Sequence, residues 1–189
     1  MLKSSRKIIQ GRYVMSKTIE YSFNGYAATV ITPDKPNGKW IWKTEFLYAF
    51  DKAEQALVED GYTRVNYKIS DMYGSYNAVR LMHAFHLDLL TRFPLCKKAN
   101  LFGFSRGGLY AFNYSLFYPE YVDKVYLDAP VLDLASWPWE DSPEQAGMLE
   151  EYCLTKDTLK KFKGSPVYNF KEFFSNKLPL LVIAGGSDE

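Results

Sequence analysis

The stretch Gly103-Phe104-Ser105-Arg106-Gly107 decides the fold of this chain, because here a Gly-x-Ser-x-Gly pentapeptide lies between an expected strand and an expected helix. Residues 99–102 form a short apolar run that predicts a buried strand, and from Arg106 onward apolar residues recur at helical spacing. The turn between them must be very tight. A serine at its apex takes strained backbone angles, and Gly103 and Gly107 allow strand and helix to approach closely. The pentapeptide predicts a nucleophilic serine; the simpler interpretation is a turn whose serine has no chemical role.

The second informative stretch is residues 178–189, an apolar run followed by Gly185-Gly186 and then Asp188. A serine nucleophile needs a base, and that base needs a carboxylate to orient it. With both stretches the chain resembles the α/β-hydrolase superfamily, whose catalytic residues occur in the order Ser, Asp or Glu, His. The resemblance implies that Ser105 carries the acyl group of an acyl-enzyme and that Asp188 is the triad acid. Asp128 and Asp133 are alternative acids, because some members carry the carboxylate after the preceding strand.

The histidine that this resemblance implies has no counterpart after Asp188. The only histidines are His83 and His86, on an expected helix over 76–93 that packs on the sheet away from the catalytic loops. We therefore expect core or boundary histidines, since no acid or cysteine beside them suggests a metal site. The resemblance therefore implies a serine esterase truncated before its base, which we expect to be inactive or weakly active as given. The alternative is a non-catalytic binding protein or inactive fragment.

An oxyanion hole needs two backbone donors, one from the residue after the nucleophile and one from the loop after the third parallel-sheet strand. The resemblance implies Arg106 as the first donor and Lys43 or Thr44 as the second. Trp42-Lys43-Thr44-Glu45 replaces the His-Gly pair that is common in this loop. A nucleotide-binding loop is disfavoured, because Leu109-Tyr110 occupies the positions where a P-loop has Lys and Ser or Thr.

The order of elements predicts an α/β fold with a mostly parallel sheet flanked by helices on both faces, lacking the last strand and helix of the family. Two strands at 17–23 and 26–32 are joined by Asn24-Gly25, which favours a tight hairpin turn. Further strands are expected at 40–42, 63–69, 99–102, 124–127 and 180–184, and helices at 47–57, 76–93, from 106, around 143–161 and at 167–176. Residues 17–189 form the expected domain.

Two segments have open interpretations. Residues 134–177 are either a cap insertion over the active site or an ordinary sheet-covering helix with a long loop. Residues 1–16 are expected to be a disordered basic leader, with Met1 or Met15 as the start; they show neither a secretory signal nor a membrane span.

Length and composition agree with a single folded domain. The chain has 189 residues, 47% apolar, and a net charge of +1, which gives no general attraction to nucleic acid or an anionic membrane. Cys96 and Cys153 lack metal or redox spacing, so reduced thiols and a cytoplasmic location are expected. The expected partner is a small-molecule ester or acyl substrate, with no cofactor and no metal. Self-association through an exposed, apolar edge strand at 180–184 is also expected.

Overall fold

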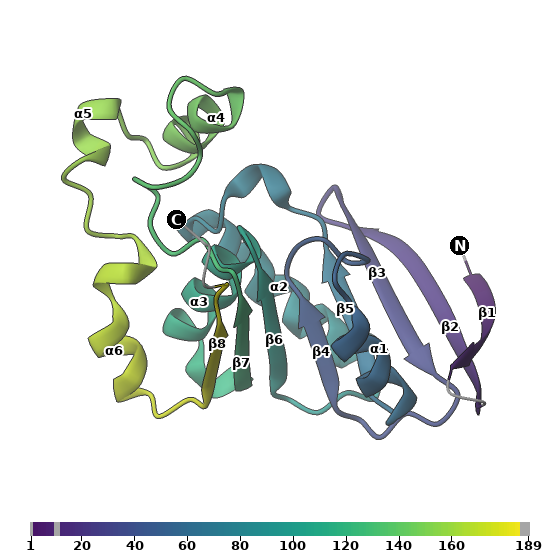
Figure 1. The fold of residues 1–189 in the computed structure, drawn as a ribbon. Coiled ribbons are helices and arrows are strands. Elements are labelled where there is room, and N and C mark those ends of the chain that lie inside the picture. Colours follow the sequence, from purple (N-terminus) through teal and green to yellow (C-terminus); the bar gives the residue numbers. More distant parts are fainter. Residues whose placement is uncertain (1, 10–11, 186–189) are drawn as a thin grey trace.

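The computed structural model describes residues 2–9 and 12–185, and their strands form one eight-stranded sheet in the order β1-β2-β3-β5-β4-β6-β7-β8 (Figure 1). The strands are β1 (Leu2–Ile9), β2 (Arg12–Phe23), β3 (Tyr26–Pro33), β4 (Trp40–Lys43), β5 (Thr63–Tyr67), β6 (Ala99–Phe104), β7 (Val122–Asp128) and β8 (Leu180–Ile183). The helices are α1 (Lys52–Glu59), α2 (Tyr76–Arg92), α3 (Gly107–Phe117), α4 (Pro143–Glu151), α5 (Lys156–Leu159) and α6 (Phe170–Ser175), with 3-10 turns at Ser70–Met72, Pro119–Tyr121 and Pro166–Tyr168.

The sheet has an antiparallel part followed by a parallel part, which confirms the predicted fold class. Strands β1, β2 and β3 pair antiparallel, and β3 pairs antiparallel with β5. From β5 onward the neighbours β4, β6, β7 and β8 are parallel. Asn24 and Gly25 join β2 to β3 with φ angles of 46° and 85°. Positive φ at both central residues is what a two-residue hairpin turn requires, so the predicted hairpin is confirmed.

The start of the chain differs from the expected disordered leader. Residues 2–9 form β1, which pairs with β2 from Leu2↔Ile19 to Ile9↔Arg12. The physical reason is that β2 continues back to Arg12 and would otherwise present a free edge of backbone N–H and C=O groups, which the folded-back chain satisfies. No helix among the described residues is long and apolar enough to cross a membrane.

The first helix begins later than its apolar pattern predicts, at Lys52 in place of Leu47. Phe46 and Phe50 have φ angles of 53° and 50°, and left-handed residues interrupt a right-handed helix. The apolar side chains of this segment pack as a loop: the Phe50 ring lies 4.9 Å from the ring of Phe104 at the end of β6. Residues 44–51 therefore form a loop that reaches over the carboxyl ends of β4 and β6.

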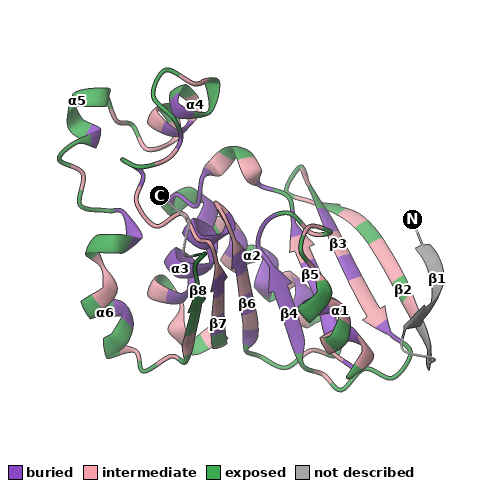
Figure 2. Ribbon diagram, in the orientation of Figure 1, coloured by how far each residue is buried: buried purple, intermediate pink, exposed green. Residues whose placement is uncertain are grey.

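Most of the core lies between the sheet and the helices α2 and α3 (Figure 2). Trp42 of β4 and Tyr67 of β5 pack on Phe85 of α2, with ring centroids 5.5 and 4.3 Å apart. The other face is covered by α1 beside β3 and β5. On β8 the side chains of Leu181, Val182 and Ile183 are exposed, and because consecutive side chains of a strand point to opposite faces, both faces of the sheet are open at this edge.

Candidate active site

Ser105 lies at the sharp turn between β6 and α3, in the strand–turn–helix context that a nucleophile elbow requires. Its φ angle is 51°, a left-handed conformation that costs a non-glycine residue about 1 kcal/mol or more. Three hydrogen bonds hold it there. The Ser105 N–H donates to the Asp128 carbonyl at 3.0 Å, and its carbonyl accepts from the N–H groups of Gly108 and Val131, both at 2.9 Å. The strained turn is therefore fixed by the end of β7 and by the segment after it.

The two glycines of the pentapeptide are required by close contacts. A Cβ atom on Gly103 would lie 2.8 Å from the Gly107 carbonyl oxygen and 2.9 Å from the Gly108 Cα. A Cβ atom on Gly107 would lie 2.9 Å from the Thr44 Oγ1 atom. All three distances are below van der Waals contact, so strand, helix and the 44–51 loop meet only because these side chains are absent.

The loop after β4 is tied to the elbow through Thr44. The Thr44 N–H donates to the Phe102 carbonyl at 3.1 Å, and its hydroxyl donates to the Gly107 carbonyl at 2.8 Å. The Thr44 N–H is therefore occupied within the sheet, and this hydrogen bond contradicts its expected role as an oxyanion donor. Lys43 pairs with Phe102 inside the parallel ladder, and its buried ammonium group contacts Glu54.

Glu45 is the residue of this loop that the sequence did not single out. Its carboxylate oxygen Oε2 accepts hydrogen bonds from Nε and Nη2 of Arg106, at 3.2 and 3.1 Å. The Glu45 side chain is only 3% exposed, and its other oxygen, Oε1, has no hydrogen-bond partner among the described residues. The backbone N–H groups of Glu45 and Arg106 likewise meet no protein acceptor in the part of the chain that the structure describes. Two features of the sequence could have indicated this contact. A glutamate stands in the loop where α/β-hydrolases commonly have His-Gly, and an arginine directly follows Ser105.

The three candidate acids have different surroundings. Asp188 lies outside the described residues. Asp128 ends β7 beside the elbow, and one of its carboxylate oxygens accepts a hydrogen bond from the Tyr126 hydroxyl at 3.3 Å. Burial and the Asp128 charge together raise the pKa of Tyr126. Asp133 accepts the Ala135 N–H at 3.0 Å, so its carboxylate stabilises a local turn.

His83 and His86 both lie on α2 and serve the core, as predicted. The His86 Nδ1 atom lies 2.8 Å from the Tyr114 hydroxyl, and Nε2 lies 2.8 Å from the Lys97 carbonyl. Because a carbonyl can only accept, Nε2 carries the proton and the Tyr114 hydroxyl donates to Nδ1. Burial lowers the pKa of His86 to about 4. The His83 ring stacks on Tyr118 at 3.8 Å. Both rings are thereby held between α2 and α3. Among the described residues there is no cluster of acids, histidines and cysteines suited to a metal ion.

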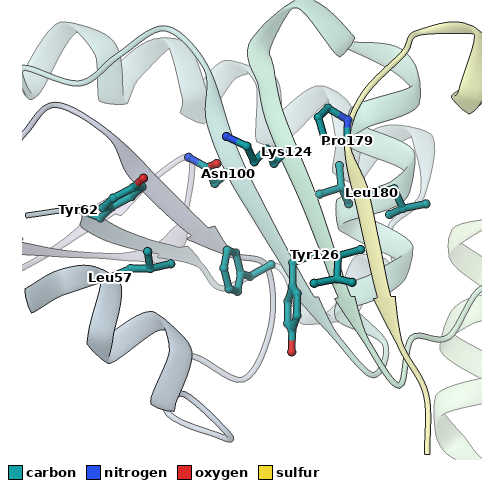
Figure 3. A pocket seen from close by; sticks show the side chains of 10 residues that line it. Leu57, Tyr62, Asn100, Lys124, Tyr126, Pro179 and Leu180 are labelled. Carbon is teal, nitrogen blue, oxygen red and sulfur yellow. The ribbon is translucent and has the colours of Figure 1, made fainter. Parts of the chain in front are cut away.

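Two cavities lie on the α1 face of the sheet. The larger, of about 460 Å³, lies between α1 and β8, and Figure 3 shows its mostly apolar walls. Asn100, Lys124 and Pro179 place it towards the amino ends of the parallel strands, whereas Ser105 lies at the carboxyl ends. The smaller, of about 370 Å³, adjoins the elbow. It is lined by Ala27, Thr29, Glu45, Phe46, Leu47, Tyr48, Asn66, Lys68, Ser70 and Arg106.

Residues 134–176 occupy two places in the fold (Figure 1). Helix α4 contacts the 3-10 turn that follows β5, at the carboxyl end of the parallel strands. It is anchored there because the Tyr152 hydroxyl donates to the Tyr73 carbonyl at 3.0 Å. Helix α6 packs on α3 instead, with the rings of Phe173 and Phe112 stacked 4.7 Å apart. One part of this segment therefore adjoins the loops around Ser105, and another covers a helix of the core.

No protein-family model and no curated protein sequence matches the chain. Solved structures do resemble it. S-formylglutathione hydrolase (FrmB) from Staphylococcus aureus superposes with a TM-score of 0.64 at 15% identity, over 90% of this chain and 79% of that one. S-formylglutathione hydrolase from Agrobacterium tumefaciens gives 0.59 at 12% identity, over 95% and 88% of the two chains. The thioesterase domain from the curacin biosynthetic pathway gives 0.56 at 12% identity, over 91% and 83%. The chain has the α/β-hydrolase fold.

Proposed function

We propose that this protein is a serine hydrolase of small carboxylic esters or thioesters that forms an acyl-enzyme on Ser105. The observation that carries the proposal is the left-handed Ser105, held by hydrogen bonds at the strand–helix turn where the fold places a nucleophile. Strain of this kind persists only where the surrounding structure imposes it, and it is concentrated at functional sites. Two structural neighbours are S-formylglutathione hydrolases, so a thioester of a small thiol is one candidate substrate.

In this mechanism the Ser105 Oγ attacks the carbonyl carbon of the substrate, and its proton passes to a base. The negative charge that develops on the carbonyl oxygen is stabilised by the backbone N–H of Arg106 and, in place of Thr44, by that of Glu45. The C–O or C–S bond to the leaving group then breaks, and the leaving group takes up a proton. Water hydrolyses the acyl group from Ser105 in a second step. Asp188 remains the proposed acid that orients the base, with Asp128 as the alternative beside the elbow.

The base is not among the histidines of the described residues, because His83 and His86 are held between α2 and α3. We therefore expect the 189-residue chain to turn over esters slowly. Binding and oxyanion stabilisation alone accelerate the reaction about 10³- to 10⁴-fold over water in well-formed sites. We expect the rate enhancement of this chain to be no larger than that.

The test is p-nitrophenyl acetate with the 189-residue chain, followed by mass spectrometry of the intact protein and of its peptides. We expect slow release of nitrophenol and one acetyl group on Ser105, absent in Ser105→Ala and retained in the control Ser175→Ala, an exposed serine on α6. Rapid turnover that Ser105→Ala abolishes would show that a competent base lies within the chain. Acetylation that is unchanged in Ser105→Ala would refute the proposal.

A second candidate is a binding protein for acyl compounds that does not turn them over. The observation that favours it is the commitment of both histidines to the core. It predicts saturable binding of an ester without any acetylation of Ser105, which the same experiment distinguishes.

A further inference from the structure

The smaller cavity on the α1 face lies next to the turn that carries Ser105. One wall is the loop that follows β4, and the other is formed by the facing strands β3 and β5, where Thr29 pairs with Asn66. Arg106, the residue directly after Ser105, also lines it. A group bound in this cavity would therefore lie close to the turn that carries Ser105.

Glu45, one of the residues that line this cavity, has a buried carboxylate oxygen without a partner among the described residues. Glu45 lines the cavity and is 3% exposed, and Arg106 donates both of its hydrogen bonds to Oε2, which leaves Oε1 unpaired among the described residues. A buried acceptor without a donor is costly, and native structures almost always supply one from protein, water or ligand. Glu45 Oε1 thus requires a hydrogen-bond donor.

Charge in and around the cavity favours a neutral donor. The negative charge of Glu45 is already balanced by Arg106, and the exposed Lys68 adds a second positive charge at the rim. An ammonium group would face two cations, and a carboxylate would face the unpaired oxygen of Glu45. An amide N–H or a hydroxyl satisfies Oε1 without either repulsion.

We propose, on the basis of the proposed hydrolase function, that this cavity is a substrate subsite in which Glu45 Oε1 accepts a hydrogen bond from a neutral donor, an amide N–H or hydroxyl. The substrate class is then an ester or thioester with a polar, hydrogen-bond-donating group a short distance from the scissile carbonyl. Peptide-like and hydroxylated acyl compounds have this chemistry, whereas simple fatty acyl compounds do not.

The test measures binding without catalysis, in the Ser105→Ala protein. The two probes are N-acetylglycine methyl ester and methyl 4-oxopentanoate, which differ only in an N–H group against a CH₂ group. Ligand-observed NMR titration gives both affinities. We expect the amide probe to bind about tenfold more tightly than the ketone probe, because a hydrogen bond to a charged acceptor contributes about that difference in affinity. Adding Glu45→Ala should remove this difference, and the control Glu172→Ala, on the exposed side of α6, should keep it.

A second variant tests the cavity without touching the ion pair. Thr29→Phe places a ring in the cavity from β3, where an aromatic residue suits a strand, and it should weaken binding of the amide probe even if Glu45→Ala does not fold. Equal affinity for the two probes, no binding of either at millimolar concentration, or a preference that survives both variants would overturn the subsite. Acetylation of the wild-type chain is measured separately. A preference for the amide probe without acetylation of Ser105 would support the subsite and refute the proposed hydrolase function.

Discussion

Glu45 and Arg106 join the loop after β4 to the turn between β6 and α3, because Nε and Nη2 of Arg106 both donate to Oε2 of Glu45, at 3.2 and 3.1 Å. The guanidinium group also lies 5.1 Å from the centre of the Phe46 ring. The backbone N–H groups proposed for the oxyanion hole belong to these same two residues. This ion pair, together with the hydrogen bond from the Thr44 hydroxyl to the Gly107 carbonyl, therefore links the two segments that carry the proposed donors.

This ion pair predicts a non-additive effect on stability. Arg106→Met leaves a buried, uncompensated carboxylate, and we expect it to lower the free energy of unfolding by about 2 to 3 kcal/mol, below the range for fully buried pairs because Arg106 is partly exposed. Adding Glu45→Gln should recover part of that loss, since the neutral pair leaves no buried charge. Urea unfolding of the single and double variants measures the coupling. A double variant that loses the sum of the two single losses would show that the pair contributes nothing specific.

The backbone angle of Ser105 predicts that a non-glycine residue at this position lowers stability. Its φ angle is 51°, so Ser105→Gly should stabilise the protein by about 1 kcal/mol relative to Ser105→Ala, because glycine adopts this conformation without strain. Ser136, which has no positive φ angle, is the control, and Ser136→Gly should lower stability slightly. Thermal unfolding of these three variants and of the wild-type chain measures the effect. Equal stability of Ser105→Gly and Ser105→Ala would mean that the turn stores no strain.

His86 predicts a loss of stability at mildly acidic pH. Burial lowers its pKa in the folded protein to about 4 from an ordinary value of 6.5. Between those values the unfolded chain binds a proton that the folded protein does not. The contribution is therefore fully present above about pH 6.5 and is lost as the pH falls towards 4, by roughly 3 kcal/mol in all. His86→Gln, which cannot titrate, should flatten this part of the curve of unfolding free energy against pH. An unchanged slope would assign the pH dependence to other groups.

Local sequence patterns predicted the parts of the fold that depend on local geometry. The pentapeptide around Ser105 was sufficient because Gly103 meets Gly107 within the same turn, and Asn24-Gly25 was sufficient because positive φ at adjacent residues defines the hairpin turn. The placement of His83 and His86 on α2, with His86 in the core, followed from helical spacing alone. The role of Thr44 could not be read in this way, since its N–H is occupied by Phe102, a neighbour in space but distant in sequence.

The features that sequence missed are set by tertiary contacts. The pairing of residues 2–9 with β2 depends on an edge that exists only after β2 and β3 have paired. The apolar spacing of Leu47 and Phe50 resembles a helix, but the residues pack over β6 as a loop, which overrides that pattern. The contact of Glu45 with Arg106 spans 61 positions, and no periodicity reports a contact of that range.

The last prediction concerns β8, which among the described residues pairs with β7 on one side only and carries the sequence Leu-Leu-Val-Ile. Leu181, Val182 and Ile183 are 56%, 44% and 45% exposed, and a long apolar edge without charge is a template for pairing with another chain. We expect the 189-residue chain to self-associate, and Val182→Lys to reduce association because it places a charge on the strand. Val167→Lys is the matched control, since Val167 is 42% exposed but lies in a 3-10 turn away from this edge. Size-exclusion chromatography with light scattering at tens of micromolar measures the mass of each variant. A monomeric wild-type chain, or equal effects of the two lysines, would show that β8 is not the surface through which the chain associates.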